Sequence, residues 1–457
     1  MVFSSLPFLL FFLPAVLLGA HVLPRGWRNG FLLIANLFFY AYGEPVYVLL
    51  MLFSILLNYT AGVLMERLSG RKKAVMVTAV VVDIALLCVF KYTGLVTDTL
   101  RHIPALAGLP EVTLPLPIGI SFYTFQAVSY VVDVYRGDCR ATGNFVNFAA
   151  YISLFPQLIA GPIVRYSDVY DQLEHRTETL SGFSVGVRLF VIGLAKKVLL
   201  ANQLGLLWEQ TAADPAAVGT LGLWMGAAAY TLQIYFDFSG YSDMARGLGK
   251  MLGFDVCINF NYPYISRTVT EFWRRWHMSL SSWFRDYVYI PLGGNRRGQV
   301  RMCMNILIVW MLTGLWHGAG WNFLFWGLYY GVLLLIEKLF LGKYLQKLPA
   351  AVGHIYTMLI VMIGWVFFAS NTLGDAFVYI RLMFTPAAGS ANTVLPWLGT
   401  ILAGAVCSLP VGQRLWVRWK DKPVMPVLEA AACLLALLLC TACLVSDSYN
   451  PFLYFRF

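Results

Sequence analysis

Residues 311–327 read Met-Leu-Thr-Gly-Leu-Trp-His-Gly-Ala-Gly-Trp-Asn-Phe-Leu-Phe-Trp-Gly. This stretch places one histidine, His317, between two apolar runs, 303–316 and 319–336, neither of which contains a charged residue. Because a membrane-spanning helix needs about 20 mostly apolar residues, the two runs predict membrane helices that meet at His317. An ionisable side chain at membrane depth is costly, so it indicates a functional site.

Three glycines surround this histidine, namely Gly314, Gly318 and Gly320. The spacing of Gly314 and Gly318 is typical of a close helix crossing, because small residues let another backbone approach. Such packing explains the glycines but leaves the histidine unexplained. A histidine that hydrogen-bonds to a neighbouring helix is the structural alternative, and a catalytic or ligand-binding role is the favoured interpretation.

The composition excludes a soluble globular enzyme, a disordered chain and a coiled coil. Of the 457 residues, 59% are hydrophobic and 12% are charged, against about 45–50% and 25% in soluble domains. The mean hydropathy is +0.68. The net charge of +10 would suggest nucleic acid in a soluble protein. Here it follows the preference of basic residues for cytoplasmic loops, so membrane lipids and no nucleic acid are expected as partners.

Twelve apolar segments are candidates for membrane crossing. They are 2–23, 30–42, 45–64, 74–90, 117–134, 183–208, 217–236, 303–316, 319–337, 352–369, 393–410 and 427–446. Two further regions fail as simple spans: Pro156 and Pro162 interrupt 145–166, and 237–300 holds much of the charge. A broken segment at membrane depth must be buried in protein or line a cavity. With no repeat and no long polar stretch, the chain 1–457 is expected to be one membrane domain.

The second stretch with chemical potential is 271–287, Glu-Phe-Trp-Arg-Arg-Trp-His-Met-Ser-Leu-Ser-Ser-Trp-Phe-Arg-Asp-Tyr. Read as one helix, it carries an apolar stripe of Trp273, Trp276, Leu280, Trp283 and Tyr287. A neighbouring polar stripe contains Arg274, His277, Ser281 and Arg285. An interfacial amphipathic helix with tryptophan anchors is the structural interpretation. The histidine within the polar stripe favours a functional one.

The two histidines form a plausible pair for group transfer. A neutral imidazole accepts a proton near neutral pH, and a base within hydrogen-bond reach of a hydroxyl can activate it for attack on an acyl carbon. An apolar site excludes the water that would hydrolyse the acyl group. Of His277 and His317, one would act as the base and the other would orient or stabilise. The sequence contains no zinc-type ligand set, no G-x-S-x-G elbow and no Walker A motif, so no metal is expected.

Several motifs together resemble the membrane-bound O-acyltransferase family, in its bacterial branch of alginate O-acetyltransferase membrane subunits. They are the 272–287 run, Trp316-His317-Gly318, Pro117–Gln126, Phe155–Pro162, Tyr235–Met244, Pro291–Asn295 and the aromatic tail. The resemblance covers about residue 117 to the end of the chain. No single motif is specific, but their combination is.

The resemblance implies an all-α polytopic membrane protein, with a ring of about 11–13 transmembrane helices and re-entrant segments around a central funnel. It implies that His317 is the catalytic histidine and that His277 is a second catalytic candidate. It further implies a multi-pass protein of the bacterial cytoplasmic (inner) membrane, with no permanently bound cofactor. The acyl donor would be acetyl-CoA reached from the cytoplasm. The acetyl group would pass to a polysaccharide hydroxyl, through an extracytoplasmic acetyltransferase of the SGNH type.

Further residues are expected to line a tunnel for substrate or donor. They are Trp273, Arg274, Trp276, Ser281, Arg285, Asp237, Gln126, Gln157, Trp316 and Asn322. For Asp237 and Asp243, a salt bridge to arginines of 271–287 is the favoured interpretation and a cavity role the second. Three other functions stay open, namely D-alanyl transfer to teichoic acid from a carrier-protein thioester, long-chain acyl transfer, and non-enzymatic transport.

Overall fold

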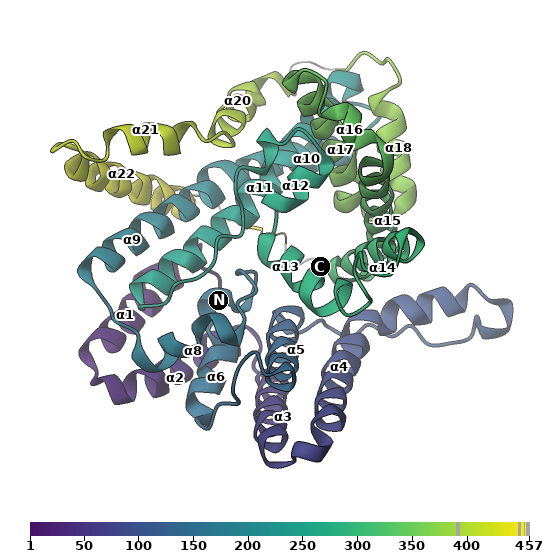
Figure 1. Ribbon diagram of the computed structural model, residues 1–457. Helices are drawn as coiled ribbons and strands as arrows, with labels where there is room; N and C mark the ends of the chain where they lie inside the picture. Colours follow the sequence, from purple (N-terminus) through teal and green to yellow (C-terminus); the bar gives the residue numbers. More distant parts are fainter. Residues whose placement is uncertain (390–393, 447–448, 452, 454–457) are drawn as a thin grey trace. The chain divides into compact units, whose positions relative to one another are not determined.

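The computed structural model describes residues 1–389, 394–446, 449–451 and 453, and every regular element in these residues is a helix (Figure 1). Among them, six helical segments are long and apolar enough to cross a membrane, and the pair Leu395–Cys407 (η8 and α20) and Val411–Trp419 (α21), bent by 54°, makes a seventh if it is one span. The six are Val48–Arg67, Lys72–Arg101, Gln299–His317, Trp321–Leu345, Ala350–Ala369 and Met425–Ser446. The predicted all-α polytopic membrane class is therefore confirmed.

The other predicted spans are not, by themselves, helices long and apolar enough to cross a membrane. The ring of 11–13 helices around a funnel therefore stays a prediction. The first apolar helix, for example, covers Phe8–Val22 and is too short to qualify alone. The predicted segment 393–410 begins at a residue outside the described ones. Its described part, η8 and α20, qualifies only together with α21.

The chain divides into two compact units, which are described separately. Unit 1 comprises Met1–Phe190 and Tyr241–Cys257, and unit 2 comprises Val191–Gly240 and Ile258–Phe457. Two of the boundaries fall within α9 (Leu180–Ala195) and α11 (Gly219–Met251), and the third follows Cys257, after the end of α11. The single domain 1–457 stays a prediction.

The other helices of unit 1 are η1 (Phe8–Phe12), α1 (Leu13–Val22), α2 (Arg25–Gly43), α3 (Val48–Arg67), η2 (Ser69–Arg71), α4 (Lys72–Arg101), η3 (Pro104–Leu106), α5 (Ile120–Arg136), α6 (Phe145–Ser153), α7 (Phe155–Leu158) and α8 (Tyr166–His175). Helices α3, α4 and α5 pack against one another (Figure 1). A buried carboxylate links two of them: Asp83 of α4 accepts hydrogen bonds from Ser54 Oγ at 3.0 Å and Asn58 Nδ2 at 2.8 Å, both on α3. This satisfies a polar group that lipid could not.

The segment 145–166 is interrupted, as predicted, and its residues 147–164 are buried within unit 1. Helix α6 ends at Ser153, and Leu154 separates it from the single turn of α7. Polar groups at the break are paired inside the protein: Tyr151 Oη donates to the Val164 carbonyl and Gln157 Nε2 donates to the Tyr151 carbonyl, both at 2.9 Å. Irregular backbone at membrane depth needs such internal partners, which confirms the expected burial.

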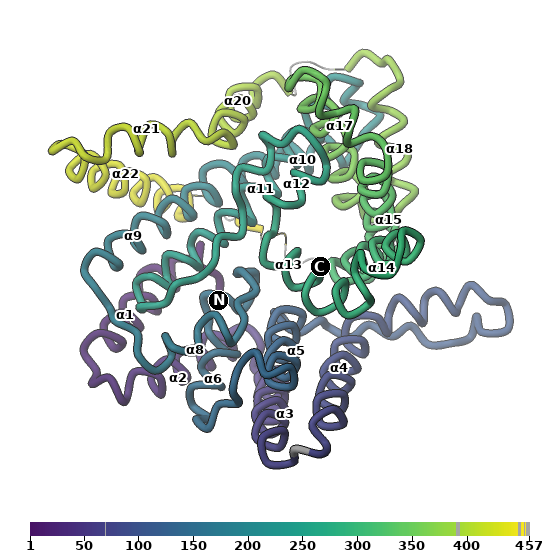
Figure 2. Tube along the Cα trace, in the orientation of Figure 1, coloured from purple at the N-terminus to yellow at the C-terminus, as the bar shows by residue number. Residues whose placement is uncertain are grey.

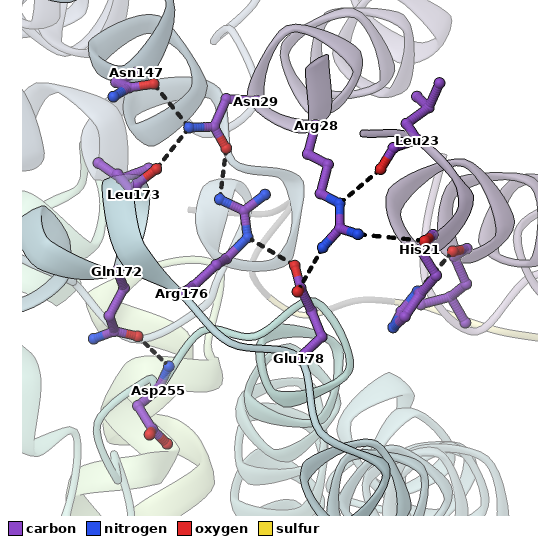
Figure 3. Close-up of polar contacts among 11 residues, drawn as sticks. His21, Leu23, Arg28, Asn29, Asn147, Gln172, Leu173, Arg176, Glu178 and Asp255 are labelled. Carbon is purple, nitrogen blue, oxygen red and sulfur yellow. Dashed lines mark hydrogen bonds and ion pairs between the residues drawn. The ribbon is translucent and has the colours of Figure 1, made fainter. Parts of the chain in front are cut away.

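A polar network ties α2 to α6 and to the loop between α8 and α9 (Figure 3). Arg28 Nη1 lies 2.6 Å from Glu178 Oε2, and Arg176 Nε lies 3.4 Å from Glu178 Oε1. Arg176 Nη1 also donates to Asn29 Oδ1, whose Nδ2 donates to Asn147 Oδ1 at 2.8 Å. The Glu178 carboxylate thus partly neutralises two arginines, Arg28 near the start of α2 and Arg176 directly after α8.

Replacing Glu178 with glutamine is expected to destabilise the protein by about 1–3 kcal/mol at pH 7, because two guanidinium groups lose a charged acceptor. Burial would raise the pKa of Glu178, but the hydrogen bond and charge of Arg28 and the charge of Arg176 hold it below its ordinary value. A carboxylate whose pKa is lower in the folded protein than its unfolded value of about 4.3 stabilises the folded state above that pH. This stabilisation is lost as the pH falls through the folded-state pKa. Thermal unfolding at pH 7 and below pH ~4 should therefore show a difference between wild type and Glu178→Gln that shrinks in acid.

The exposed Glu174 is the matched control, and Glu174→Gln should leave the melting temperature unchanged at both pH values. An equal difference between wild type and Glu178→Gln at both pH values would contradict the electrostatic role of Glu178.

The other elements of unit 2 are η4 (Lys196–Ala201), α10 (Asn202–Ala213), η5 (Pro263–Ile265), α12 (Val269–Arg275), α13 (Met278–Phe284), η6 (Arg285–Tyr289), α14 (Gln299–His317), α15 (Trp321–Ile336), η7 (Glu337–Leu341), α16 (Gly342–Leu345), α17 (Ala350–Ala369), α18 (Leu373–Met383), η8 (Leu395–Trp397), α20 (Leu398–Cys407), α21 (Val411–Trp419) and α22 (Met425–Ser446). In the green part of the trace, α14 and α15 run side by side, and α15 also packs on α17 (Figure 2). These three helices form the frame of the candidate site.

The helix predicted to end at residue 236 continues instead through Asp237 to Met251. Asp237 does not end it, because its carboxylate is buried and lies 2.6 Å from Lys197 Nζ. Gly240 allows close packing here, since a Cβ atom at this position would lie 2.7 Å from the Gly193 carbonyl oxygen. The expected pairing of Asp237 with arginines of 271–287 is therefore wrong. Asp243 likewise has Arg246, at 3.5 Å, as an ion-pair partner.

Candidate active site

His317 is the last residue of α14, at the turn that leads into α15. The two helices approach closely at glycines: a Cβ atom at Gly314 would collide with the Phe323 carbonyl, and one at Gly327 with the Trp310 carbonyl. This confirms the close helix crossing predicted from Gly314, and the partner is the next helix in the chain. The tight crossing fixes the end of α14 and with it the histidine.

The imidazole of His317 lies among three aromatic rings. Ring centroids of Trp316, Trp326 and Phe368 are 4.9, 5.1 and 5.2 Å from it, all in edge-to-face geometry. The rings come from α14, α15 and α17, and only 5% of His317 is exposed. The surroundings of this titratable group are therefore largely apolar, and such surroundings exclude bulk water.

The stretch 271–287 is not one helix. Helix α12 ends at Arg275, His277 has left-handed backbone angles (φ +44°, ψ +55°), and α13 begins at Met278. An extended segment beside the break takes up the freed backbone groups: Asn261 N–H donates to the Arg275 carbonyl, and Met278 N–H donates to the Asn259 carbonyl. Helical periodicity failed here because tertiary hydrogen bonds replace the intrahelical ones.

The predicted polar stripe is consequently wrong. His277 is buried, with 1% exposed, whereas Arg274, Ser281 and Arg285 are exposed. Arg285 pairs with its neighbour Asp286, Nε to Oδ1 at 2.6 Å. Because the break turns His277 into the protein, the histidine does not share a face with these polar residues.

The structure brings the two histidines to the same tryptophan. The centroid of the His277 ring lies 6.0 Å from that of Trp316, which also contacts His317. Phe238 of α11 packs on His277 at 4.6 Å. Burial lowers the pKa of His277 to about 3, so the imidazole is uncharged at neutral pH.

Two predicted tunnel tryptophans join this aromatic cluster. Trp273 contacts Tyr330 at 4.8 Å and Trp326 at 5.5 Å, and Trp276 contacts Trp365 at 4.8 Å, as centroid distances. Together with Trp316, these rings form the aromatic cluster that surrounds the histidines. The three tryptophans are thus placed at the candidate site.

The remaining predicted residues have other surroundings. Asn322 of α15 donates to the Ser370 carbonyl at 2.9 Å and so ties α15 to the end of α17. Gln126 and Gln157 are buried in unit 1, whereas both histidines belong to unit 2. Among the described residues, no group of three or more His, Cys, Asp and Glu side chains could hold a metal ion.

Two residues of the site were missed by sequence reasoning. Glu337, buried in the π-helical turn after α15, accepts from the backbone N–H groups of Val269 and Thr270 at 2.7 and 2.8 Å and so caps α12. Asn259 accepts hydrogen bonds from residues around the α12–α13 break. Neither residue carries a sequence signal, because its partners are distant in the chain. The partners of Glu337 lie 68 and 67 residues away, and those of Asn259 lie 18 and 20 residues away.

Comparison with known proteins gives one family and consistent relatives. Residues 35–371 match the model of the membrane-bound O-acyltransferase family. The chain is 44% identical to a probable alginate O-acetylase, AlgI, of Pseudomonas aeruginosa, over 84% of this chain and 75% of that protein. The protein of the same name from Pseudomonas putida is 40% identical over the full length of both chains. A peptidoglycan O-acetyltransferase of Helicobacter pylori is 31% identical, over 84% and 80%.

Proposed function

Because the chain belongs to the membrane-bound O-acyltransferase family, we propose that it moves an acetyl group from acetyl-CoA at the cytoplasmic face toward a polysaccharide hydroxyl outside, with His317 as the base. The observation that carries this proposal is a buried histidine in an aromatic cage, whose tryptophan also contacts a second buried histidine. Such a site supplies a proton acceptor in surroundings that protect a thioester from water.

The chemistry follows from these two properties. The unprotonated imidazole nitrogen of His317 takes the proton of the acceptor hydroxyl as its oxygen attacks the thioester carbonyl carbon. The new C–O bond forms, the C–S bond breaks, and the departing thiolate takes the proton from the imidazolium. His277, uncharged and in contact with Trp316, would orient the acceptor or stabilise the charge that develops.

The names of the relatives support the acetyl group and the polysaccharide. The relatives with 40–44% identity are described as alginate O-acetylases, and a more distant one as a peptidoglycan O-acetyltransferase. We therefore place the enzyme in exopolysaccharide O-acetylation of the alginate type, in the bacterial inner membrane. The last acceptor is outside the cell and the donor inside, so an extracytoplasmic SGNH-type acetyltransferase is the proposed partner for the final transfer.

The donor is tested with the purified full-length protein in detergent. Acetyl-CoA carrying a labelled acetyl group and a D-alanyl-loaded carrier protein are supplied separately, and free thiol and transferred label are followed. With alginate oligosaccharide and the SGNH-type partner present, we expect thiol release from acetyl-CoA and label on the oligosaccharide.

Consumption of the carrier thioester alone would overturn the acetyl-CoA assignment in favour of D-alanyl transfer. Consumption of neither would favour the transporter alternative. Label that reaches the oligosaccharide equally without the partner would overturn the proposed relay.

A further inference from the structure

We infer that Asn259 is a positioning residue, which holds His277 as the tautomer with its proton on Nδ1 and so presents an unprotonated Nε2 to the site. The inference rests on the proposed function, in which His277 contacts the reacting groups. It concerns a residue that lies 18 positions before His277 and outside every motif discussed above.

The hydrogen bonds of Asn259 identify its side-chain oxygen. Its Oδ1 accepts from the Ser279 backbone N–H at 3.2 Å and from Ser279 Oγ at 2.9 Å. A backbone N–H can only donate. If the amide were flipped, two donors would face each other, so the atom at this position must be the oxygen.

The same oxygen determines the proton position on His277. Nδ1 of His277 lies 3.2 Å from Asn259 Oδ1. Since this amide oxygen has no proton to give, Nδ1 must donate. A neutral imidazole carries one ring proton, so Nε2 carries the lone pair. Within the part of the chain that the structure describes, Nε2 is buried and has no hydrogen-bond partner.

Asn259 also holds the backbone on which His277 sits. Its carbonyl accepts from the Met278 N–H at 3.0 Å, directly after the left-handed residue. A non-glycine residue in this conformation is strained and persists only where the surroundings over-determine it. Main-chain and side-chain contacts of one asparagine thus bind residues 277–279 as a unit.

Among the residues that the structure describes, the rings that pack on His277 carry no charge. The rings that contact it are Phe238 of α11, Phe260 of the extended segment and Trp316 of α14. Asp237, next to Phe238, is paired with Lys197. Two titratable residues of the described chain are close in sequence to these contacts: His317, adjacent to Trp316, and Arg275, which pairs with Glu271. Asn259 is therefore the polar contact that selects the tautomer.

The test compares Asn259→Ala and Asn259→Asp with Asn261→Ala, in full-length protein supplied with acetyl-CoA. Asn261 lies in the same extended segment with an exposed side chain, and its contacts with Arg275 use backbone atoms. We expect Asn259→Ala to lower kcat about 10–100-fold, by analogy with the loss of a partner that orients a metal-bound histidine, with KM little changed. Asn261→Ala should stay within about twofold of wild type, as expected for a surface change.

Asn259→Asp separates positioning from a merely structural role. The aspartate retains the acceptor and so the tautomer, and should restore most of kcat. Its negative charge favours the imidazolium form, so the acid limb of the kcat–pH profile should move to higher pH. A profile that coincides with that of wild type, or a kcat of Asn259→Ala equal to that of Asn261→Ala, would overturn the inference.

A spectroscopic readout keeps the inference independent of the proposed reaction. In protein labelled with nitrogen-15 histidine, the His277 signals, assigned by their loss in His277→Gln, report which ring nitrogen bears the proton. We expect the Nδ1–H form in wild type and a tautomer mixture in Asn259→Ala. An Nε2–H form in wild type would overturn the inference, whereas a wild type that leaves acetyl-CoA intact would overturn the proposed function alone.

Discussion

Replacing His317 with alanine is expected to lower kcat for acyl transfer about 10²–10⁴-fold, the range that a positioned general base contributes. The imidazole is the titratable group inside the cage of Trp316, Trp326 and Phe368. An alanine there leaves no atom that could take the proton of the acceptor hydroxyl. Thiol release from the acyl donor by purified protein supplied with the acceptor, at matched expression, measures the effect.

Two further variants separate chemistry from packing. Alanine leaves a void among three rings, so His317→Gln, which retains most of the volume and a polar end, should be as inactive while melting closer to wild type. His102, an exposed residue after α4, is the control, and His102→Ala should retain full turnover. Normal turnover of a well-expressed His317→Ala protein would sink the assignment of His317 as the base.

Replacing Asp237 with alanine is expected to destabilise the protein by about 3–5 kcal/mol, because it leaves the Lys197 ammonium buried without its carboxylate. Both side chains are almost fully buried, with 4% of Lys197 and 2% of Asp237 exposed. The pair also holds the end of the described chain: Asp237 Oδ2 accepts from the Leu453 N–H at 2.9 Å, and Lys197 Nζ donates to the Pro451 carbonyl. Thermal unfolding in detergent should show a large fall in melting temperature.

A double variant tests this explanation. Replacing both charges with apolar residues, Lys197→Met with Asp237→Leu, should recover much of the lost stability, since a buried pair is often replaced by hydrophobic residues without net cost. Asp98→Ala is the control, because its pair with Arg101 is exposed and 3.9 Å long, and such pairs contribute about 0–1 kcal/mol. A melting temperature of Asp237→Ala that matches that of Asp98→Ala would contradict the buried-pair account.

Much of the fold was predictable because lipid imposes a strong constraint on sequence. The apolar runs that became α3, α4, α14, α15, α17 and α22 appear in composition alone, since a helix must hide its backbone from hydrocarbon. The same constraint made Pro156 and Pro162 informative about the broken segment 145–166. It also singled out His317, which is conspicuous because its neighbours are uncharged.

Periodicity was misleading where tertiary contacts replace helical ones. The stretch 271–287 has a regular apolar spacing, yet Asn259 and Asn261 accept or donate the hydrogen bonds that a continuous helix would make itself. In the same way, Asp237 looked like the polar end of a span. Lys197 neutralises it within the protein, so α11 continues.

The sequence by itself determined the all-α membrane class, the interruption of 145–166 and the isolation of His317, because these depend on which residues lipid tolerates. Only the tertiary structure decided the orientation of His277, the partner of Asp237 and the contacts of Asn259. Each depends on a hydrogen bond or ion pair between residues from 18 to 40 positions apart. Neither spacing nor composition predicts such contacts. A polar group needs a partner within the protein only once folding has removed it from water, and the fold decides which partner it meets.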